Sequence, residues 1–290
     1  MAIDAIQQEI IHARLIGVVQ EMQDALFRTG YSTIIRESQD ASCALADTTG
    51  QVVAQHTVLP LHLGSFPACV KGLIDTYAFD DIQEGDAFIV NDPYSGGSPH
   101  APDMAVITPV FYQGKLIAFA GSIAHKSDIG GMVPGSCSGN AKEIFQEGLQ
   151  LPVIRYAVDF KVSREIETII RANSRTPDLV AGDIAGQVGC ARLGERRLRD
   201  LIDKYGLEAI NDTFDNTVDL TEKRLRQAIL TWKEGVYEGD CYLDSDGVDY
   251  AKQVCVRTKI TIKGDRILFD FSSSDDQAAG PYNIRPPVVR

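Results

Sequence analysis

Two of the five histidines lie in the most polar, glycine-rich part of the sequence. His100 precedes Asp103 with only Ala101 and Pro102 between them, and His125 follows in the next such segment. Because proline fixes its own φ and restricts the residue before it, we expect His100 and Asp103 to converge on one point. Two imidazoles and one carboxylate can hold a transition metal or zinc and leave coordination positions open.

The chain between Asp103 and His125 predicts a β-hairpin. Apolar runs at residues 104–110 and 116–124 are separated by a turn that contains Gln113 and Gly114. Antiparallel pairing about this turn sets residues 103 and 125 nearly opposite each other, which brings His125 toward the other two side chains. From spacing alone the alternative stays open that these are hydrogen-bonded loop histidines.

The expected ion is Zn²⁺, Mn²⁺ or Fe²⁺, which could activate water or polarise a carbonyl or phosphoryl oxygen. Three acids are candidates for catalysis, as general bases or as groups that complete or orient the metal shell: Asp40, Asp128 and Glu147. Asp92 and Glu143 are softer candidates of the same kind. The alternative for each acid is turn and cap chemistry.

Other polar positions near these motifs have plainer interpretations. His62 has apolar neighbours, which favours a buried, hydrogen-bonded structural role. The glycine pairs at 96–97 and 130–131 either let backbone amides approach an anionic substrate or form tight turns. The six cysteines form no Cys-x-x-Cys pair and suit free thiols, and Cys137 is interpreted as inert because no base stands beside it in the sequence.

The pattern along the chain predicts an α+β fold. An apolar stripe between residues 6 and 27 predicts an N-terminal helix that ends at Gly30, and short β-prone runs up to about residue 155 predict a strand-rich, metal-binding lobe. Helices are expected after Ser163, from 177 to Gly206 and over 207–232, followed by strands at 254–262 and 266–271. The predicted domain organisation is a metal-binding lobe with the N-terminal helix at 1–162, a helical segment at 163–238 and a strand region at 239–290. We expect that this last region is truncated, because its final apolar run does not complete an element.

Composition limits the classes of function. A formal net charge of -12 argues against a broad nucleic-acid surface, which needs clustered Lys and Arg. No apolar stretch reaches the roughly 18 residues that a membrane helix needs, and the acidic start of the chain does not resemble a signal peptide. We therefore expect a cytoplasmic protein without nucleic-acid or membrane partners.

A set of short motifs covers most of residues 30–160. The main ones are Arg36-Glu-Ser-Gln-Asp40, Pro60-Leu-His-Leu-Gly-Ser65, Asn91-Asp-Pro-Tyr94, His100-Ala-Pro-Asp103, Asp128-Ile-Gly-Gly131 and Glu143-Ile-Phe-Gln-Glu-Gly-Leu149. With these motifs the sequence resembles the hydantoinase B/oxoprolinase family, which includes the alpha-type subunits of acetone carboxylase. The resemblance implies a metal held by a His-x-x-Asp pair and a later histidine, at positions that match His100, Asp103 and His125.

The resemblance also implies a companion A-type subunit that uses ATP to activate the substrate oxygen. This sequence contains no Gly-x-x-x-x-Gly-Lys-Ser/Thr motif of its own. The leading expectation is a B-type subunit, within a hetero-oligomer, that hydrolyses a lactam or imide after that activation. The alternatives are a subunit of an ATP-dependent ketone carboxylase, a catalytically silent metal-binding fragment, and a stand-alone metallohydrolase.

Overall fold

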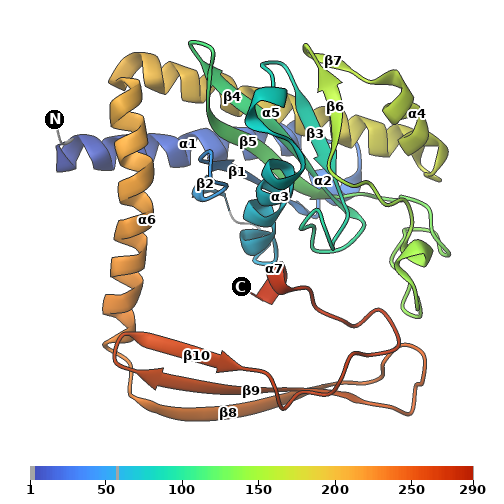
Figure 1. Cartoon of the computed structure of the whole chain (residues 1–290). Coiled ribbons are helices and arrows are strands. Elements are labelled where there is room, and N and C mark those ends of the chain that lie inside the picture. Colours follow the sequence, from blue (N-terminus) through green and yellow to red (C-terminus); the bar gives the residue numbers. More distant parts are fainter. Residues whose placement is uncertain (1–3, 57–58, 290) are drawn as a thin grey trace. The chain divides into compact units, whose positions relative to one another are not determined.

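The computed structural model describes residues 4–56 and 59–289 (Figure 1). Within these ranges the chain forms two compact units that interleave along the sequence. The first takes in the described residues of Met1–Cys137, Glu147–Phe214 and Ile284–Arg290, and the second takes in Ser138–Gln146 and Asp215–Asn283. The boundary at residues 214–215 falls within helix α6 (Leu207–Ile229). The α+β class predicted from the sequence is confirmed.

A seven-stranded antiparallel sheet forms the centre of the first unit, in the order β2-β1-β5-β4-β3-β6-β7. Its strands are β1 (Ala41–Ala46), β2 (Val52–Gln55), β3 (Ala87–Val90), β4 (Asp103–Tyr112), β5 (Lys115–His125), β6 (Ile154–Val158) and β7 (Lys161–Val162). The sequence predicted the first five of these strands. Strands β4 and β5 are buried along most of their length, so the hairpin predicted from the sequence forms the middle of the sheet.

Helices cover both faces of this sheet (Figure 1). On one face, α1 (Ala5–Thr29) and α5 (Pro177–Tyr205) bury residues such as Leu15 and Leu198 against Cys43 and Leu45 of β1. On the other face, α3 (His62–Thr76) packs Phe66 and its neighbours against the intervening residues of the same strand. Successive side chains of a strand point to opposite faces, so both faces bury apolar surface and the unit has three layers.

The helix ends follow their sequence signals. Asp4 accepts a hydrogen bond from the amide of Ile6 at the start of α1, and Ser163 caps α4 (Arg164–Ala172) through the amide of Ile166. Helix α5 has Pro177 in its first turn and ends before Gly206, whose φ is 88°. Four shorter helices complete the described chain: α2 (Thr33–Arg36), η1 (Phe79–Asp81), η2 (Ile144–Glu147) and α7 (Pro286–Val289).

The second unit contains a three-stranded antiparallel sheet in the order β10-β9-β8. Its strands are β8 (Gly235–Leu243), β9 (Val254–Lys263) and β10 (Arg266–Asp270). The sequence predicted the β9–β10 hairpin but not β8, whose two glycines resemble loop punctuation. Across the described ranges, no helix combines the length and apolar character that crossing a bilayer requires.

Candidate metal centre

The β4–β5 hairpin sets Asp103 directly opposite His125. Its turn is at Gln113 and Gly114, whose φ values of 49° and 76° are those of a tight two-residue hairpin turn. The register predicted from the sequence is therefore confirmed. His100 ends the loop before β4, and its carbonyl accepts a hydrogen bond from the Asp103 amide at 3.1 Å, which folds the two residues into a turn.

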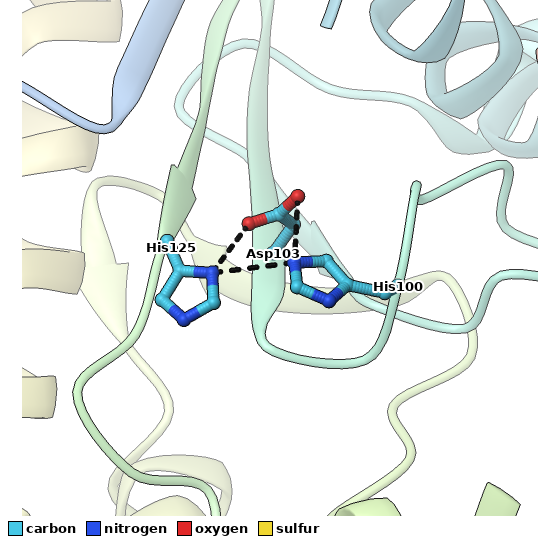
Figure 2. Close-up of side chains that lie close together, drawn as sticks. All are labelled: His100, Asp103 and His125. Carbon is cyan, nitrogen blue, oxygen red and sulfur yellow. Dashed lines mark hydrogen bonds and ion pairs between the residues drawn. The ribbon is translucent and has the colours of Figure 1, made fainter. Parts of the chain in front are cut away.

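The side chains of His100, Asp103 and His125 form a small triangle, in which two imidazole nitrogens and the two carboxylate oxygens face one another (Figure 2). Nδ1 of His125 lies 3.1 Å from Oδ1 of Asp103, and Nε2 of His100 lies 3.1 Å from Oδ2. The two imidazole nitrogens are 3.2 Å apart. Ligand atoms about 2.1 Å from one small divalent ion are roughly 3 to 3.4 Å from each other, and each of these three separations lies in that range.

The triangle is buried on one side and open on the other. The side chain of Asp103 is 2% exposed, whereas that of His100 is 42% exposed. Burial alone would raise the pKa of Asp103, but its contacts with His100, His125 and His62 hold the pKa well below its usual value. A carboxylate that stays ionised in a buried position is suited to bind a cation.

The pKa of His125 is shifted in the opposite direction from that of Asp103. Burial lowers the pKa of this imidazole, but its contacts with Asp103 and Cys137 outweigh burial and raise the pKa to about 10. A proton on His125 thus occupies the position that a cation could take beside Asp103. The donor set fits a divalent metal ion both in its dimensions and in its charge.

A second group of possible ligands shares Asp103 and adds Asp40 and His62. His62 is fully buried, and its Nδ1 lies 2.9 Å from Oγ of Ser42, which confirms the buried, hydrogen-bonded histidine predicted from the sequence. Its Nε2 faces Oδ2 of Asp103 at 3.5 Å and has no hydrogen-bond partner among the described residues. This contact has no local sequence signal, because His62 and Asp103 come from separate elements.

Asp40 immediately precedes β1 and is half-buried. Burial raises the pKa of its carboxyl group, and the negative charge of Asp103 raises it further. A cation between the two carboxylates would remove this repulsion. Asp40 therefore lies beside the triangle and adds a second carboxylate to its surroundings.

Asp128 lies outside both groups of possible ligands. Its oxygens accept hydrogen bonds from the amides of Gly130, Gly135 and Arg175 at 2.9 Å and from the guanidinium of Arg175 at 3.0 Å. Burial raises the pKa of Asp128, but these hydrogen bonds outweigh burial and lower it. In this structure Asp128 holds the loop that follows His125.

Glu147 is half-buried and is the last residue of the short helix η2. Burial raises the pKa of its carboxyl group, and the charge of His100 lowers it in part. Glu147 thus interacts electrostatically with the most exposed of the three candidate ligands, although it does not belong to either group of possible metal ligands.

Both glycine pairs are built into tight turns. Gly97, Gly130 and Gly131 have φ values of 77°, 91° and 80°, which side chains rarely adopt. The carbonyls of Gly130 and Gly131 accept hydrogen bonds from Arg175, and a Cβ on Gly97 would lie 2.6 Å from the backbone of Ala68. The turn interpretation of both pairs is thereby supported.

The six cysteines are free thiols, as predicted. Cys137 is exposed, and its Sγ lies 3.9 Å from Nε2 of His125, on the side of the ring away from Asp103. A possible base for Cys137 is thus present in space although none stands beside it in the sequence. The loop between them brings the two residues together.

The fold and the site define a class: an α+β protein in which two histidines and one carboxylate meet at the end of a central hairpin. A family model described as "Hydantoinase B/oxoprolinase" matches residues 4–290. The chain belongs to the hydantoinase B/oxoprolinase family.

Individual relatives agree with this assignment. The chain is 38% identical over 293 residues to a putative D-/L-hydantoinase subunit of Pseudomonas sp. (strain NS671), covering 97% of this chain and 49% of the relative. It is 30% identical over 291 residues to the acetophenone carboxylase delta subunit of Aromatoleum aromaticum (strain DSM 19018 / LMG 30748 / EbN1), covering 99% of this chain and 42% of the relative.

A solved structure shows the same fold. The ATP-dependent caprolactamase from Pseudomonas jessenii superposes with a TM-score of 0.88 at 28% identity, over 99% of this chain and 49% of that chain. The chain spans about half of the length of the curated relatives it matches. Several of these relatives are named as enzyme subunits, and the caprolactamase of the solved structure is named as ATP-dependent.

Proposed function

We propose that this chain carries the metal centre of a B-type subunit that hydrolyses a lactam or imide after an A-type subunit has activated the ring with ATP. His100, Asp103 and His125 bind one Zn²⁺, Mn²⁺ or Fe²⁺ ion, and Asp40 completes its shell. The observation that carries the proposal is the triangle of side chains, in which each imidazole nitrogen lies 3.1 Å from a carboxylate oxygen of Asp103 and 3.2 Å from the other imidazole nitrogen. The named hydantoinase and caprolactamase relatives supply the class of substrate.

A bound divalent ion would supply Lewis acidity at a carbonyl or phosphoryl oxygen of the activated substrate. Asp103 provides the buried negative charge that holds the ion, and its contacts orient both imidazoles. His100, with 42% of its side chain exposed, borders the open side from which a substrate would approach. The pairing of β4 with β5 keeps His125 and Asp103 in register.

Ring opening needs a group that accepts a proton from water as water adds to the carbonyl carbon. The carbon–nitrogen bond then breaks, the ring nitrogen takes up a proton, and a second water molecule releases the ATP-derived phosphate from the oxygen to leave a carboxylate. Glu147 is the better candidate for this transfer, because burial raises the pKa of its carboxyl group and because it does not belong to the proposed ligand set. Asp40 could take this role only if it does not bind the ion. Asp128 acts indirectly, by holding the loop after His125.

Ketone carboxylation is the second candidate, favoured by the acetophenone carboxylase relative, which matches 99% of this chain. Its chemistry would use the same ion to polarise a ketone-derived oxygen. A metal-binding piece without turnover is a third possibility, because the chain spans about half of its relatives' length.

The test is reconstitution of the chain with an A-type subunit, ATP and Mn²⁺ or Zn²⁺. Hydantoin, 5-oxoproline and caprolactam are offered as cyclic amides, and acetophenone with bicarbonate is offered as a ketone. We expect ring opening that requires both ATP and the A-type subunit. Carboxylation would establish the second candidate, ring opening without ATP would indicate a stand-alone hydrolase, and no reaction with fully metallated protein would indicate a silent fragment.

A further inference from the structure

A lysine is fully buried directly behind the candidate metal centre. Lys126 follows His125 at the end of β5 and has no exposed surface. Lysine is almost never fully buried unless its ammonium group is paired. Its Nζ donates hydrogen bonds to the carbonyl of Ala124 at 2.9 Å and to Oε1 of Gln187 at 2.6 Å.

Gln187 extends the contact from β5 to β4. It lies on α5, is fully buried, and its Nε2 contacts the carbonyls of Met104 at 2.9 Å and Ser122 at 3.3 Å. Met104 and Ala124 are paired in the sheet, one step from the Asp103–His125 pair. Through Gln187 and Lys126, α5 therefore contacts both strands beside the residues that point into the triangle.

The backbone reinforces this connection. The amide of Lys126 donates to the carbonyl of Pro102 at 2.9 Å, so residues 102 and 126, the next step beyond the Asp103–His125 pair, are also joined. Neither Lys126 nor Gln187 belongs to a group of possible metal ligands. We call these two buried side chains the Lys126–Gln187 bracket.

We propose that the Lys126–Gln187 bracket positions Asp103 and His125 for metal binding, so that both residues set the metal affinity without touching the ion. The inference rests on the metal site under the proposed function. Contacts outside the first ligand shell typically change metal affinity by about 10- to 100-fold. A buried polar network whose members are all hydrogen-bonded also fixes one arrangement of the strands it joins.

An electrostatic role and a positioning role of Lys126 predict opposite changes in metal affinity for the substitution Lys126→Met. Lys126→Met removes a positive charge near the ion, so a purely electrostatic role would tighten metal binding. The bracket predicts weaker binding instead, because Gln187 loses its partner and the ends of β4 and β5 are released. Gln187→Leu removes the same contact without any change of charge and should also weaken metal binding.

The experiment measures Mn²⁺ and Zn²⁺ dissociation constants by chelator competition, at a temperature where circular dichroism shows each variant folded. Lys126→Met and Gln187→Leu should each bind about 10-fold or more weakly than the wild type. Gln187→Glu keeps the acceptor for Lys126 but loses both donors to the strands, and it serves as a second, less disruptive variant with the same expected direction.

Arg192→Met is the matched control. Arg192 lies on the same helix and donates to the carbonyls of Gly85 and Asp86 at 2.6 and 2.9 Å, in the segment that leads into β3. Its loss should lower the unfolding temperature and leave the dissociation constant unchanged. This separates a loss of general stability from a loss of ligand positioning.

His100→Ala separates the failure of the bracket from the failure of the site. If His100→Ala weakens binding while the folded bracket variants bind like Arg192→Met, the bracket inference is overturned and the metal site stands. Tighter binding by Lys126→Met would also overturn it, in favour of simple charge repulsion. If His100→Ala binds metal like the wild type, the proposed site itself is wrong.

Discussion

Asp103 and His125 are direct partners across the β4–β5 hairpin, and Nδ1 of the histidine lies 3.1 Å from Oδ1 of the carboxylate. A register shift of one residue would turn one of these side chains to the opposite face of the sheet. The candidate metal centre therefore depends on the same pairing that builds the core of the first unit.

Asp103→Asn should weaken Mn²⁺ or Zn²⁺ binding more than either single histidine substitution. The carboxylate contacts both histidines of the triangle and faces His62, so its charge acts on every candidate donor. We expect a loss of at least 100-fold in affinity, or about 2.7 kcal/mol. Calorimetric titration of folded protein checks this. Equal affinity of Asp103→Asn and the wild type would mean that the carboxylate is not a ligand.

Metal binding should stabilise the fold. A ligand that binds only the folded state adds about 2.7 kcal/mol at a free concentration of 100 times its dissociation constant. Unfolding temperatures of the wild type with Mn²⁺, and after chelation, should therefore differ by several degrees. His100→Ala should show a much smaller shift. An identical shift in both proteins would place the stabilising ion elsewhere.

Asp128→Asn should remove stability that depends on pH. The hydrogen bonds that lower the pKa of Asp128 stabilise the folded state when this group is ionised. That contribution is fully present above the unfolded pKa of about 3.9 and is lost as pH falls through the lower folded value. Denaturant unfolding should show a difference of about 1 to 3 kcal/mol between wild type and variant at pH 7. The difference should shrink below about pH 4, and a constant difference down to pH 2 would contradict this account.

Adjacent residues of α1 test the packing of the first unit. Leu15 is fully buried against β1, whereas Ile16 is 40% exposed. Leu15→Ala should lower the free energy of unfolding by about 2 to 5 kcal/mol through lost burial and a cavity. Ile16→Ala should cost less than about 1 kcal/mol. Similar losses for the two variants would mean that α1 does not present this face to the sheet.

The β4–β5 hairpin and its candidate metal ligands were predictable because the sequence signals that specify them lie close together in the chain. Two apolar runs, a Gln-Gly turn and the positions of Asp103 and His125 determine the register without reference to the rest of the chain. The main helices of residues 164–229 were predictable for the same reason, from capping residues and periodicity. The free cysteines were predicted because no two of them form a Cys-x-x-Cys pair.

Helix α3 was not predicted, because Pro67 and two further helix-breaking glycines interrupt it. It is held by burial of Phe66, Val70 and Leu73 against the sheet, and this spacing was a usable signal. The contacts of His62 with Asp103 and of Cys137 with His125 join separate elements, so they follow only from the tertiary fold.

The central claim is that one divalent ion binds His100, Asp103 and His125. The most direct test is the metal content of purified wild type, His100→Ala and His125→Ala after dialysis against Mn²⁺ or Zn²⁺, with His12→Ala on α1 as a control. We expect one ion per chain in the wild type and the control, and a sharp loss in the other two. Wild-type metal content in both His100→Ala and His125→Ala would contradict the account.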